Sequence, residues 1–291
     1  MTRPIRLPDF MIIGAQKAGT TSLIDRMSVH PSLYTAPFEI HYYDVMSNFE
    51  KGPAWYARHF EAAPAGTLIG EKTPDYLWTV RNASHPVKHN IAQKIHELTP
   101  DAKLIVVLRD PVARTRSAIG HFMRRRWLSP FDKPHDLLFG EKAHRGSTFG
   151  LIEASLYMKQ ISEFLKYFER SQIKVYIFED QIRENIGATL NDIYAFLGVD
   201  PRLQPSQFRR ARNKAFNSRY ALIANYYAPI LEPGIAAIDK LLPRSELFEM
   251  EDETLHRLCD VFQEDNEALF EFLGRRVPAW DRTRSRMTQA A

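Results

Sequence analysis

The feature that most constrains the fold of this chain is the stretch FMIIGAQKAGTTSLIDRM, residues 10–27. A short apolar run gives way to glycine, lysine and hydroxyl residues, and apolar residues then return at helical spacing. This order predicts a strand, a loop and the start of a helix. The free backbone N–H groups and the dipole of such a helix point at one spot, so the loop is suited to cradle a phosphate-like anion.

The loop differs from a Walker A loop at one decisive position. Gly14 and Gly19 have the Walker A separation, but Thr20 stands where that motif has its lysine, and the lysine comes earlier, as Lys17. Hydroxyl donors follow the second glycine: Thr20, Thr21 and Ser22. No pair of aspartates suited to magnesium accompanies the loop. We therefore expect it to bind a phosphate-like group without requiring a metal.

The rest of the chain predicts an α/β fold. Three short apolar runs predict β-strands: Phe10–Ile13, Lys103–Leu108 and Ile173–Phe178. Apolar spacing predicts three helices: 151–168, 185–198 and 255–274. Continuous apolar strands suit a parallel sheet covered on both faces. The alternation of strands and helices thus predicts a P-loop-like three-layer fold, in which helices flank a central, mostly parallel sheet.

The 291 residues show no repeat and no long linker, so we expect one domain over residues 1–280. The polar stretch 129–148 is typical of a loop, and residues 281–291 are typical of a disordered tail. A chain of this length buries roughly three-quarters of its surface on folding, so its core needs no disulfide or metal to be stable. The single cysteine, Cys259, excludes an intrachain disulfide.

Charge and hydropathy narrow the class of protein. The net charge of +4 is modest for a nucleic-acid binder, and the ten histidines lack metal-ligand spacing, so we expect neither nucleic acid nor a metal. No apolar run approaches the ~20 residues that cross a bilayer. The first residues, MTRPIRLPDF, lack the apolar segment of a signal peptide. We expect a protein without a transmembrane segment, located in the cytoplasm.

A second anion-binding position follows the strand Lys103–Leu108. Asp110 is a good N-cap and Pro111 a good first residue for the next helix. Arg109 stands at the carboxyl end of a buried strand, which in an α/β sheet faces the ligand crevice. Arg109 can bind a second phosphate through two parallel hydrogen bonds, or it can form an ion pair with a nearby carboxylate.

A third basic cluster, residues 209–216 (RRARNKAF), has no periodicity. Such a run is typical of a solvated surface. Its Phe216 also allows a second interpretation, a lid over an aromatic, multiply charged ligand.

Together these motifs resemble the sulfotransferases that use 3′-phosphoadenylyl sulfate (PAPS), in particular the heparan-sulfate N- and O-sulfotransferases and their bacterial relatives. The resemblance runs from about Phe10 to Asn217. The K-x-G-T-T loop of that family stands here as KAGTT, residues 17–21, and its R-D-P helix start as Arg109 with Ser117 eight residues later. Its late K-G-F/Y loop corresponds to Lys214-Ala215-Phe216, with alanine in place of glycine.

The resemblance implies PAPS as donor, 3′,5′-ADP (PAP) as product and no metal. It implies that the first loop binds the 5′-phosphosulfate and that Arg109 and Ser117 bind the 3′-phosphate. The residues it assigns to the donor nucleotide are Lys17, Ala18, Gly19, Thr20, Thr21, Ser22, Arg109, Ser117, Arg212, Asn213 and Lys214.

Two further motifs resemble the acceptor end of the same family. EIHYYD, residues 39–44, resembles its E-x-H-F-F-D, and EKTPDY, residues 71–76, resembles its E-K-T-P-x-Y. The resemblance implies Glu39 as catalytic base, with His41 as the rival base or as an orienting group. Lys17, Lys72 and Asp44 complete the catalytic set it implies. The structural alternative for Lys72 and Asp44 is an ion pair with each other.

Sulfuryl transfer to an acceptor hydroxyl or amine is therefore the predicted function. A P-loop nucleotide kinase is disfavoured by the position of Lys17, and a nucleotide-binding module without catalysis is disfavoured by the set of Lys17, Glu39 and Lys72. A carbohydrate or glycoconjugate is the expected acceptor, with a lipid, a secondary metabolite or a carrier-bound acyl chain as alternatives. Aromatic residues near the expected mouth either line an acceptor pocket or belong to the core: Tyr42, Tyr43, Tyr76 and Trp78.

Overall fold

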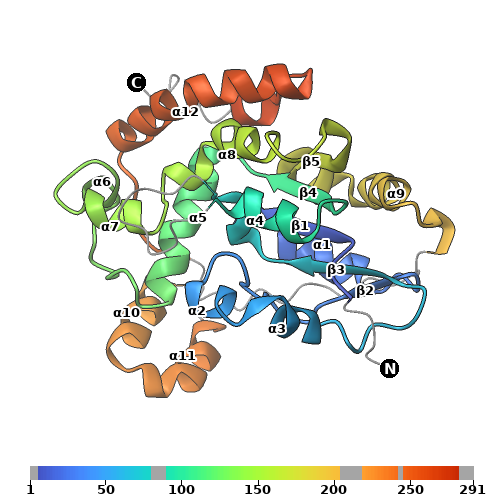
Figure 1. Cartoon of the computed structure of the whole chain (residues 1–291). Helices are drawn as coiled ribbons and strands as arrows, with labels where there is room; N and C mark the ends of the chain where they lie inside the picture. Colours follow the sequence, from blue (N-terminus) through green and yellow to red (C-terminus); the bar gives the residue numbers. More distant parts are fainter. Residues whose placement is uncertain (1–5, 80–89, 204–217, 242–244, 282–291) are drawn as a thin grey trace.

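The computed structural model describes residues 6–79, 90–203, 218–241 and 245–281. Its centre is a sheet of five strands in the order β2-β3-β1-β4-β5, and every neighbouring pair is parallel. The strands are β1 (Phe10–Gly14), β2 (Leu33–Thr35), β3 (Leu68–Lys72), β4 (Lys103–Leu108) and β5 (Ile173–Ile177). The predicted parallel α/β sheet is confirmed. Figure 1 shows the sheet at the centre of the chain, enclosed by helices.

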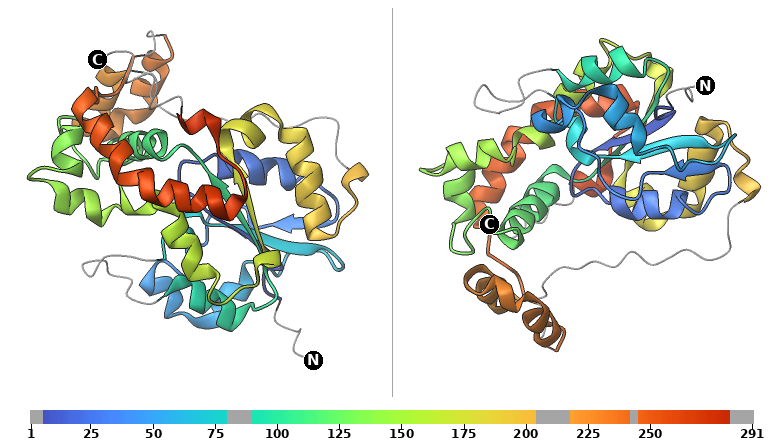
Figure 2. Two further views of the ribbon diagram at one scale, coloured as in Figure 1. Left: turned by 90° about the horizontal axis from the view of Figure 1, so that it is seen from above. Right: turned by 60° about the horizontal axis from the view of Figure 1, so that its bottom comes forward.

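The helices of the described residues are α1 (Thr20–Met27), α2 (Met46–Phe49), α3 (Gly52–Arg58), α4 (Ile91–Leu98), α5 (Pro111–Arg124), α6 (Pro134–Leu138), α7 (Ala143–Thr148), α8 (Tyr157–Phe164), α9 (Ile186–Leu197), α10 (Arg219–Tyr227), α11 (Glu232–Asp239) and α12 (Asp252–Leu273). Short helical turns lie at Pro74–Leu77, Glu153–Ser155, Arg170–Gln172, Phe178–Glu184, Pro201–Leu203 and Pro229–Leu231. Figure 2 shows α1 and α9 on one face of the sheet and α4 and α8 on the other. The crossover from β1 to β2 runs toward one edge of the sheet and the later crossovers run toward the other, so right-handed connections place helices on both faces.

The central strands β1 and β4 form the core of the protein, and their apolar side chains are fully buried. Residues 104–108 of β4 are 0% exposed, as are Phe10 to Ile13 of β1. Gly70 of β3 pairs with Phe10, and a Cβ atom at Gly70 would lie 2.1 Å from the Phe10 ring. A side chain at Gly70 would therefore push β3 away from β1. A second apolar cluster lies between α5 and α12, with Phe122 and Phe262 among its members.

Two predicted elements need correction. The helix expected over 151–168 spans only Tyr157–Phe164, as α8. It starts late because side chains of α5 take the carbonyls that an earlier helical turn would use. Arg114 donates to Gly150 O at 3.0 Å and to Leu151 O at 3.2 Å, and Thr115 also donates to Leu151 O, at 3.0 Å. The helices expected over 185–198 and 255–274 are confirmed as α9 and α12, and each ends at a left-handed glycine.

The stretch 129–148, expected to be a loop, contains α6 and α7. Its polar residues are ordered by Asp132, which is buried and accepts from Lys142 at 2.6 Å and from Arg145 at 3.3 Å. Polar composition therefore did not indicate a loop here. Of the expected tail 281–291, all but Asp281 lies outside the described residues, and the expectation of one domain over 1–280 stays a prediction.

Candidate active site

The first anion-binding loop joins the carboxyl end of β1 to α1. Gly19 is the N-cap of α1 and has φ +89°, a left-handed conformation that favours glycine. A Cβ atom at Gly19 would lie 2.7 Å from two ring carbons of Phe178, which follows β5. Lys17 also has positive φ, +72°. Thr20 is buried, whereas Thr21 is exposed and Lys17 and Ser22 are half-buried. The predicted strand–loop–helix unit is thus present, although the Ala18 amide already donates to Ala15 O at 3.1 Å.

Arg114 of α5 supports this loop from inside the protein, and the sequence interpretation gave it no role. Its side chain is only 1% exposed, and its Nε–H donates to Gln16 O at 3.1 Å. The same guanidinium donates to two carbonyls before α8. A buried arginine that satisfies three backbone carbonyls fixes the loop relative to α5.

Arg109 lies where the carboxyl end of β4 meets the loop. Its Nη1 donates to Lys17 O at 3.2 Å, and its guanidinium lies 5.4 Å from the Phe178 ring centroid. Its buried Nε has no hydrogen-bond partner within the described ranges. Among those ranges Arg109 makes no ion pair, so the alternative of a carboxylate partner finds no support there. Ser117 lies two turns into α5 and is half-buried.

The R-D-P turn is held on three sides. Asp110 is the N-cap predicted for α5, since its Oδ1 accepts from Ala113 N at 2.7 Å. The amide of Asp110 donates to Glu179 Oε1 at 3.1 Å, and the Tyr157 hydroxyl donates to Arg109 O at 2.8 Å. The backbone that carries Arg109 is therefore fixed independently of any ligand.

The acceptor motif and the lysine of EKTP come together at the carboxyl edge of β3. Lys72 forms an ion pair with Glu39, and its ammonium also donates to Thr21 Oγ1 at 3.0 Å. His41 Nε2 lies 3.3 Å from Glu39 Oε2, and His41 Nδ1 lies 2.9 Å from Asp44 Oδ2. The structural alternative, an ion pair between Lys72 and Asp44, is wrong. Asp44 is buried and pairs with His41 instead. Lys72 thus joins the first loop to the acceptor motif.

These contacts set the charges of the cluster. Burial by itself raises the pKa of Glu39, but hydrogen bonds from His41 and Lys72 and their charges bring it down to about 2. Burial lowers the pKa of His41, whereas hydrogen bonds to Asp44 and Glu39 raise it to about 10. At neutral pH Glu39 is therefore a carboxylate and His41 an imidazolium that donates from both ring nitrogens. Burial, followed by the charges of Arg124 and Arg109, lowers the pKa of Lys17 to about 8.

Ligand atoms of Glu39, His41 and Asp75 lie within 4.8 Å of one another, the spacing of a possible metal site. These atoms already have partners. Glu39 pairs with Lys72, and Asp75 accepts from Gln16 at 3.0 Å. A cation would have to displace the ammonium of Lys72, so we interpret the group as an ion-pair network and assign no metal to it.

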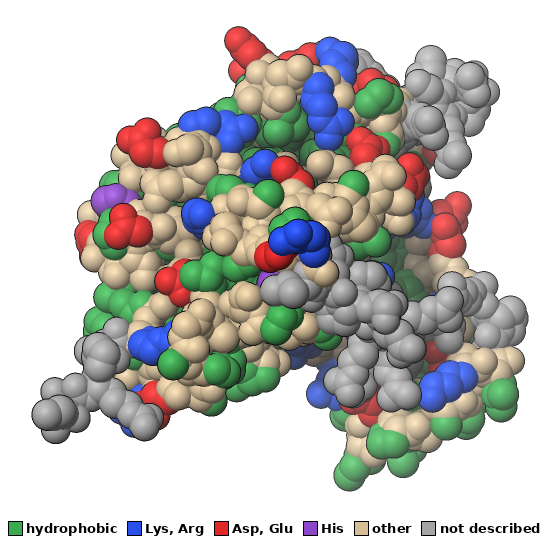
Figure 3. Space-filling view, turned by 90° about the vertical axis from the view of Figure 1, so that its right-hand side faces the viewer, with side chains coloured by type: hydrophobic (Ala, Val, Ile, Leu, Met, Phe, Trp, Pro, Cys, Tyr) green, Lys and Arg blue, Asp and Glu red, His purple; other side chains and the backbone are tan. Residues whose placement is uncertain are grey.

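The aromatic residues considered for the acceptor mouth belong to the core. Tyr42, Tyr43, Tyr76 and Trp78 are all buried, none more than 7% exposed. Phe38 and Val45 are the exposed apolar residues next to the acceptor motif, at 54% and 38%. Arg212, Asn213 and Lys214, with the rest of the basic cluster, lie outside the described residues. Figure 3 shows charged side chains of both signs interspersed over one face of the protein.

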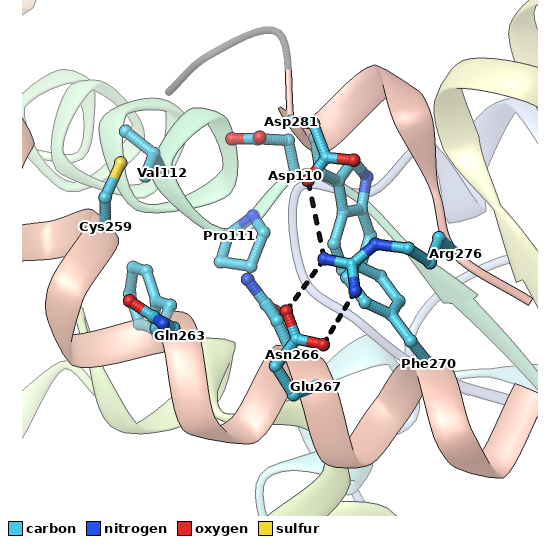
Figure 4. Close-up of a pocket in the computed structure, with 12 residues that line it drawn as sticks. Asp110, Pro111, Val112, Cys259, Gln263, Asn266, Glu267, Phe270, Arg276 and Asp281 are labelled. Carbon is cyan, nitrogen blue, oxygen red and sulfur yellow. Dashed lines mark hydrogen bonds and ion pairs between the residues drawn. The ribbon is translucent and has the colours of Figure 1, made fainter. Parts of the chain in front are cut away.

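A separate pocket lies between the start of α5 and α12 (Figure 4). Arg276 reaches across its rim and donates to both carboxylate oxygens of Glu267, each at 2.8 Å. None of the predicted site residues lines this pocket, although Asp110 and Pro111 of the turn after Arg109 do. None of the helices within the described ranges has both the length and the apolar character of a bilayer-spanning segment.

The carboxyl edge of this parallel sheet, where ligands bind in open α/β folds, thus carries the loop after β1, Arg109 and the Lys72–Glu39 ion pair. The chain belongs to the sulfotransferase domain family, which matches residues 7–224. Human heparan sulfate glucosamine 3-O-sulfotransferase 3B1 is 28% identical over 218 residues, which are 72% of this chain and 51% of the human protein. Mouse heparan sulfate glucosamine 3-O-sulfotransferase 5 is 25% identical over 224 residues, 76% of this chain and 62% of the mouse protein.

The chain thus spans about half the length of the first of these relatives. Among solved structures, a sulfotransferase from Alicyclobacillus acidocaldarius superposes with a TM-score of 0.68 and 23% identity. The superposition covers 95% of this chain and all of that structure. At this identity the similarity confirms the predicted fold.

Proposed function

We propose that this protein transfers a sulfuryl group from PAPS to an acceptor hydroxyl, with Glu39 as the base. The observation that carries the proposal is the position of Lys72, whose ammonium contacts both Thr21 of the first loop and Glu39 of the acceptor motif. The donor end and the proton-accepting end of an in-line transfer therefore lie on two sides of one ammonium.

The donor would bind along the carboxyl edge of the sheet. Lys17 and the amides of Thr20 and Thr21 would hold the 5′-phosphosulfate, and Arg109 with Ser117 would hold the 3′-phosphate. Two features support this placement. The Arg109 guanidinium lacks a carboxylate partner within the described ranges, and the first loop contains two residues with left-handed φ, a conformation that can point neighbouring amides at one anion. The cationic side chains present supply the charge that a metal would otherwise provide.

In the transfer step the acceptor oxygen attacks sulfur, and its proton passes to Glu39. The bond between sulfur and the bridging phosphate oxygen breaks, and 3′,5′-ADP leaves with the electron pair. Lys17 would stabilise the charge that develops on the leaving oxygen, while Lys72 would neutralise the sulfuryl oxygens. A positioned general base contributes about 10²–10⁴-fold. When Lys72 turns to the sulfuryl group, Glu39 loses a cation and becomes more basic.

His41 is an orienting group in this proposal and not the base. Both of its ring nitrogens face carboxylates, at 3.3 Å from Glu39 and 2.9 Å from Asp44. An imidazolium in that position has no free nitrogen to accept a proton. It holds the Glu39 carboxylate in one orientation instead.

The acceptor we propose is a carbohydrate or glycoconjugate. The support is the similarity to two proteins named as heparan sulfate glucosamine 3-O-sulfotransferases. This chain aligns with 51% of the first of them and 62% of the second.

The experiment is a product assay: PAPS is supplied with a panel of amino-sugar oligosaccharides, and release of 3′,5′-ADP is followed together with the mass of the acceptor. We expect transfer by the wild type, loss of about 10²–10⁴-fold in kcat for Glu39→Gln, and unchanged 3′,5′-ADP affinity in that variant. Glu97→Gln is the matched control, because Glu97 is an exposed helical glutamate paired with Lys94. Full turnover by Glu39→Gln would remove Glu39 as the base.

A further inference from the structure

Glu71 directly precedes Lys72, yet its side chain points the opposite way. Successive residues of a strand face opposite sides, so β3 directs Lys72 to the transfer site and Glu71 into the protein. Glu71 is 0% exposed. A fully buried carboxylate needs several donors to be tolerated, and the mechanism above gives it no task.

The donors of Glu71 are hydroxyl groups. Tyr56 of α3 donates to Glu71 Oε1, and Thr73 Oγ1 donates to Glu71 Oε2 at 3.3 Å. The Tyr76 hydroxyl also hydrogen-bonds the same carboxylate. All three residues are fully buried. The carboxyl group of Glu71 therefore gathers three hydroxyls, one from α3 and two from the turn that follows β3.

Two of these hydroxyls accept from the backbone of the acceptor motif. The amide of Tyr42 donates to the Tyr76 hydroxyl at 2.9 Å, and the amide of His41 lies 3.5 Å from Thr73 Oγ1. His41 has φ +54°, a conformation that a histidine keeps only when its surroundings hold it. The hydroxyls under this backbone supply that restraint.

The ring of Tyr42 strengthens the same connection. It stacks on Tyr56 with centroids 4.4 Å apart and an interplanar angle of 9°. The residue that donates to Glu71 from α3 thus also packs against the acceptor motif. Both the hydrogen bonds and the stacking converge on the His41–Tyr42 peptide.

We propose that Glu71 is a positioning residue for the transfer site, which holds the backbone of His41 and Tyr42 through the hydroxyls of Thr73 and Tyr76. It acts through His41 on Glu39, whereas its neighbour Lys72 contacts Glu39 directly. The catalytic importance of this role rests on the proposed function, but the positioning itself does not. Tyr56 is the third member, since its hydroxyl donates to the Glu71 carboxylate from α3.

The test uses Glu71→Gln and Tyr56→Phe, with Tyr176→Phe as the matched control. Tyr176 is also buried and also donates to a carboxylate, Asp192 Oδ2, at 2.7 Å, but it lies on β5 away from the acceptor motif. The first readout is an NMR titration of the histidines, which requires no substrate. We expect the pKa of His41 to fall toward the ordinary histidine value in both test variants and to stay high in the control.

The second readout separates kcat from donor binding. A displacement of about 1 Å in a catalytic constellation costs about 10²-fold in rate, so we expect kcat to fall by about that factor in Glu71→Gln. The affinity for 3′,5′-ADP should stay at the wild-type value, because Arg109 and the first loop do not contact Glu71. If Glu71→Gln does not fold, Tyr56→Phe carries both readouts, since the phenylalanine ring keeps the stacking on Tyr42.

The proposal is overturned if the pKa of His41 is unchanged in a folded Glu71→Gln or Tyr56→Phe protein. It is also overturned if kcat, nucleotide affinity and Tm fall together in all three variants, which would indicate general destabilisation. If the wild type transfers no sulfuryl group to any acceptor, the proposed function fails, and the His41 titration still decides whether Glu71 positions the motif.

Discussion

Glu39, in the loop after β2, forms an ion pair with Lys72, the last residue of β3. The pair brings two segments that are 33 residues apart to the same edge of the sheet. The His41 imidazolium occupies the other oxygen of Glu39. Glu39 is therefore held between two cations, and its ionisation and that of His41 respond to pH together.

The pH dependence of stability tests the His41 assignment. The pKa of His41 is about 10 in the folded protein, against 6.5 for an ordinary histidine. Its imidazolium therefore stabilises the fold fully below pH 6.5, and this contribution is lost as the pH rises through about 10. We expect the Tm difference between wild type and His41→Asn to be largest in weakly acidic buffer and to vanish at alkaline pH.

His59→Asn is the control for that series. Burial, and then the charges of Lys51 and Arg58, lower the pKa of His59, so its contribution does not decline above neutral pH. A Tm difference for His41→Asn that stays constant from pH 6 to pH 10, like that of the control, would contradict the imidazolium.

The conformation of Gly19 is open to a paired test. We expect Gly19→Ala to lose donor binding and to be destabilised by more than the roughly 1–3 kcal/mol of a left-handed alanine, because its Cβ would also meet the Phe178 ring at 2.7 Å. Gly198→Ala is the control: its φ is +83°, and nothing lies within 4 Å of the added Cβ. Chemical denaturation and 3′,5′-ADP titration of both variants give the comparison. Equal losses of stability would show that Phe178 gives way at no cost.

Arg114 should matter for stability more than any exposed cation of α5. Arg114→Met leaves the carbonyls of Gln16, Gly150 and Leu151 without this donor, and a buried acceptor without a partner costs about 1–3 kcal/mol. We expect Tm to fall by several degrees. Arg116→Met, two residues further along α5, removes only an exposed ion pair with Glu246, worth about 0–1 kcal/mol. A smaller loss for Arg114→Met than for Arg116→Met is the contrary result.

We expect Arg109 to bind the 3′-phosphate of the donor nucleotide. We expect Arg109→Ala to weaken binding of 3′,5′-ADP far more than binding of 5′-AMP, because the guanidinium would contact only the former through a charge-assisted pair. Arg125→Ala, an exposed arginine at the end of α5, is the control. Isothermal titration with both nucleotides measures the ratio. Equal losses of affinity for the two nucleotides would show that Arg109 does not contact the 3′-phosphate.

The sequence was informative where one physical signal dominates. β1, β4 and β5 are continuous apolar runs, and each was found within a residue of its observed bounds. β3 was missed because its sequence, LIGEK, ends in a glutamate and a lysine. A strand that carries site residues at its end does not look apolar. β2 has only three residues, too few for any periodicity.

Which residues form the site could likewise be predicted in part, but most contacts between them could not. The motifs put Glu39 and Lys72 in one site through family resemblance, but spacing along the chain does not reveal that Lys72 pairs with Glu39 while Asp44 pairs with His41. Arg114 stands in the sequence among other arginines of α5, and only its burial beside Gln16 distinguishes it. Glu71 looks like an exposed strand residue in the sequence, and only the structure shows that it is buried and accepts from Tyr56 of α3.

The most direct measurement is thermal denaturation with 3′,5′-ADP, with 5′-ADP, and with ATP plus magnesium, each beside a Lys17→Ala control. A ligand at a hundred times its dissociation constant stabilises the native state by about 2.7 kcal/mol, which is a shift of a few degrees. We predict stabilisation by 3′,5′-ADP alone, without metal, and its loss in Lys17→Ala. Stabilisation only by ATP with magnesium would contradict a PAPS site and would assign the loop after β1 to a kinase.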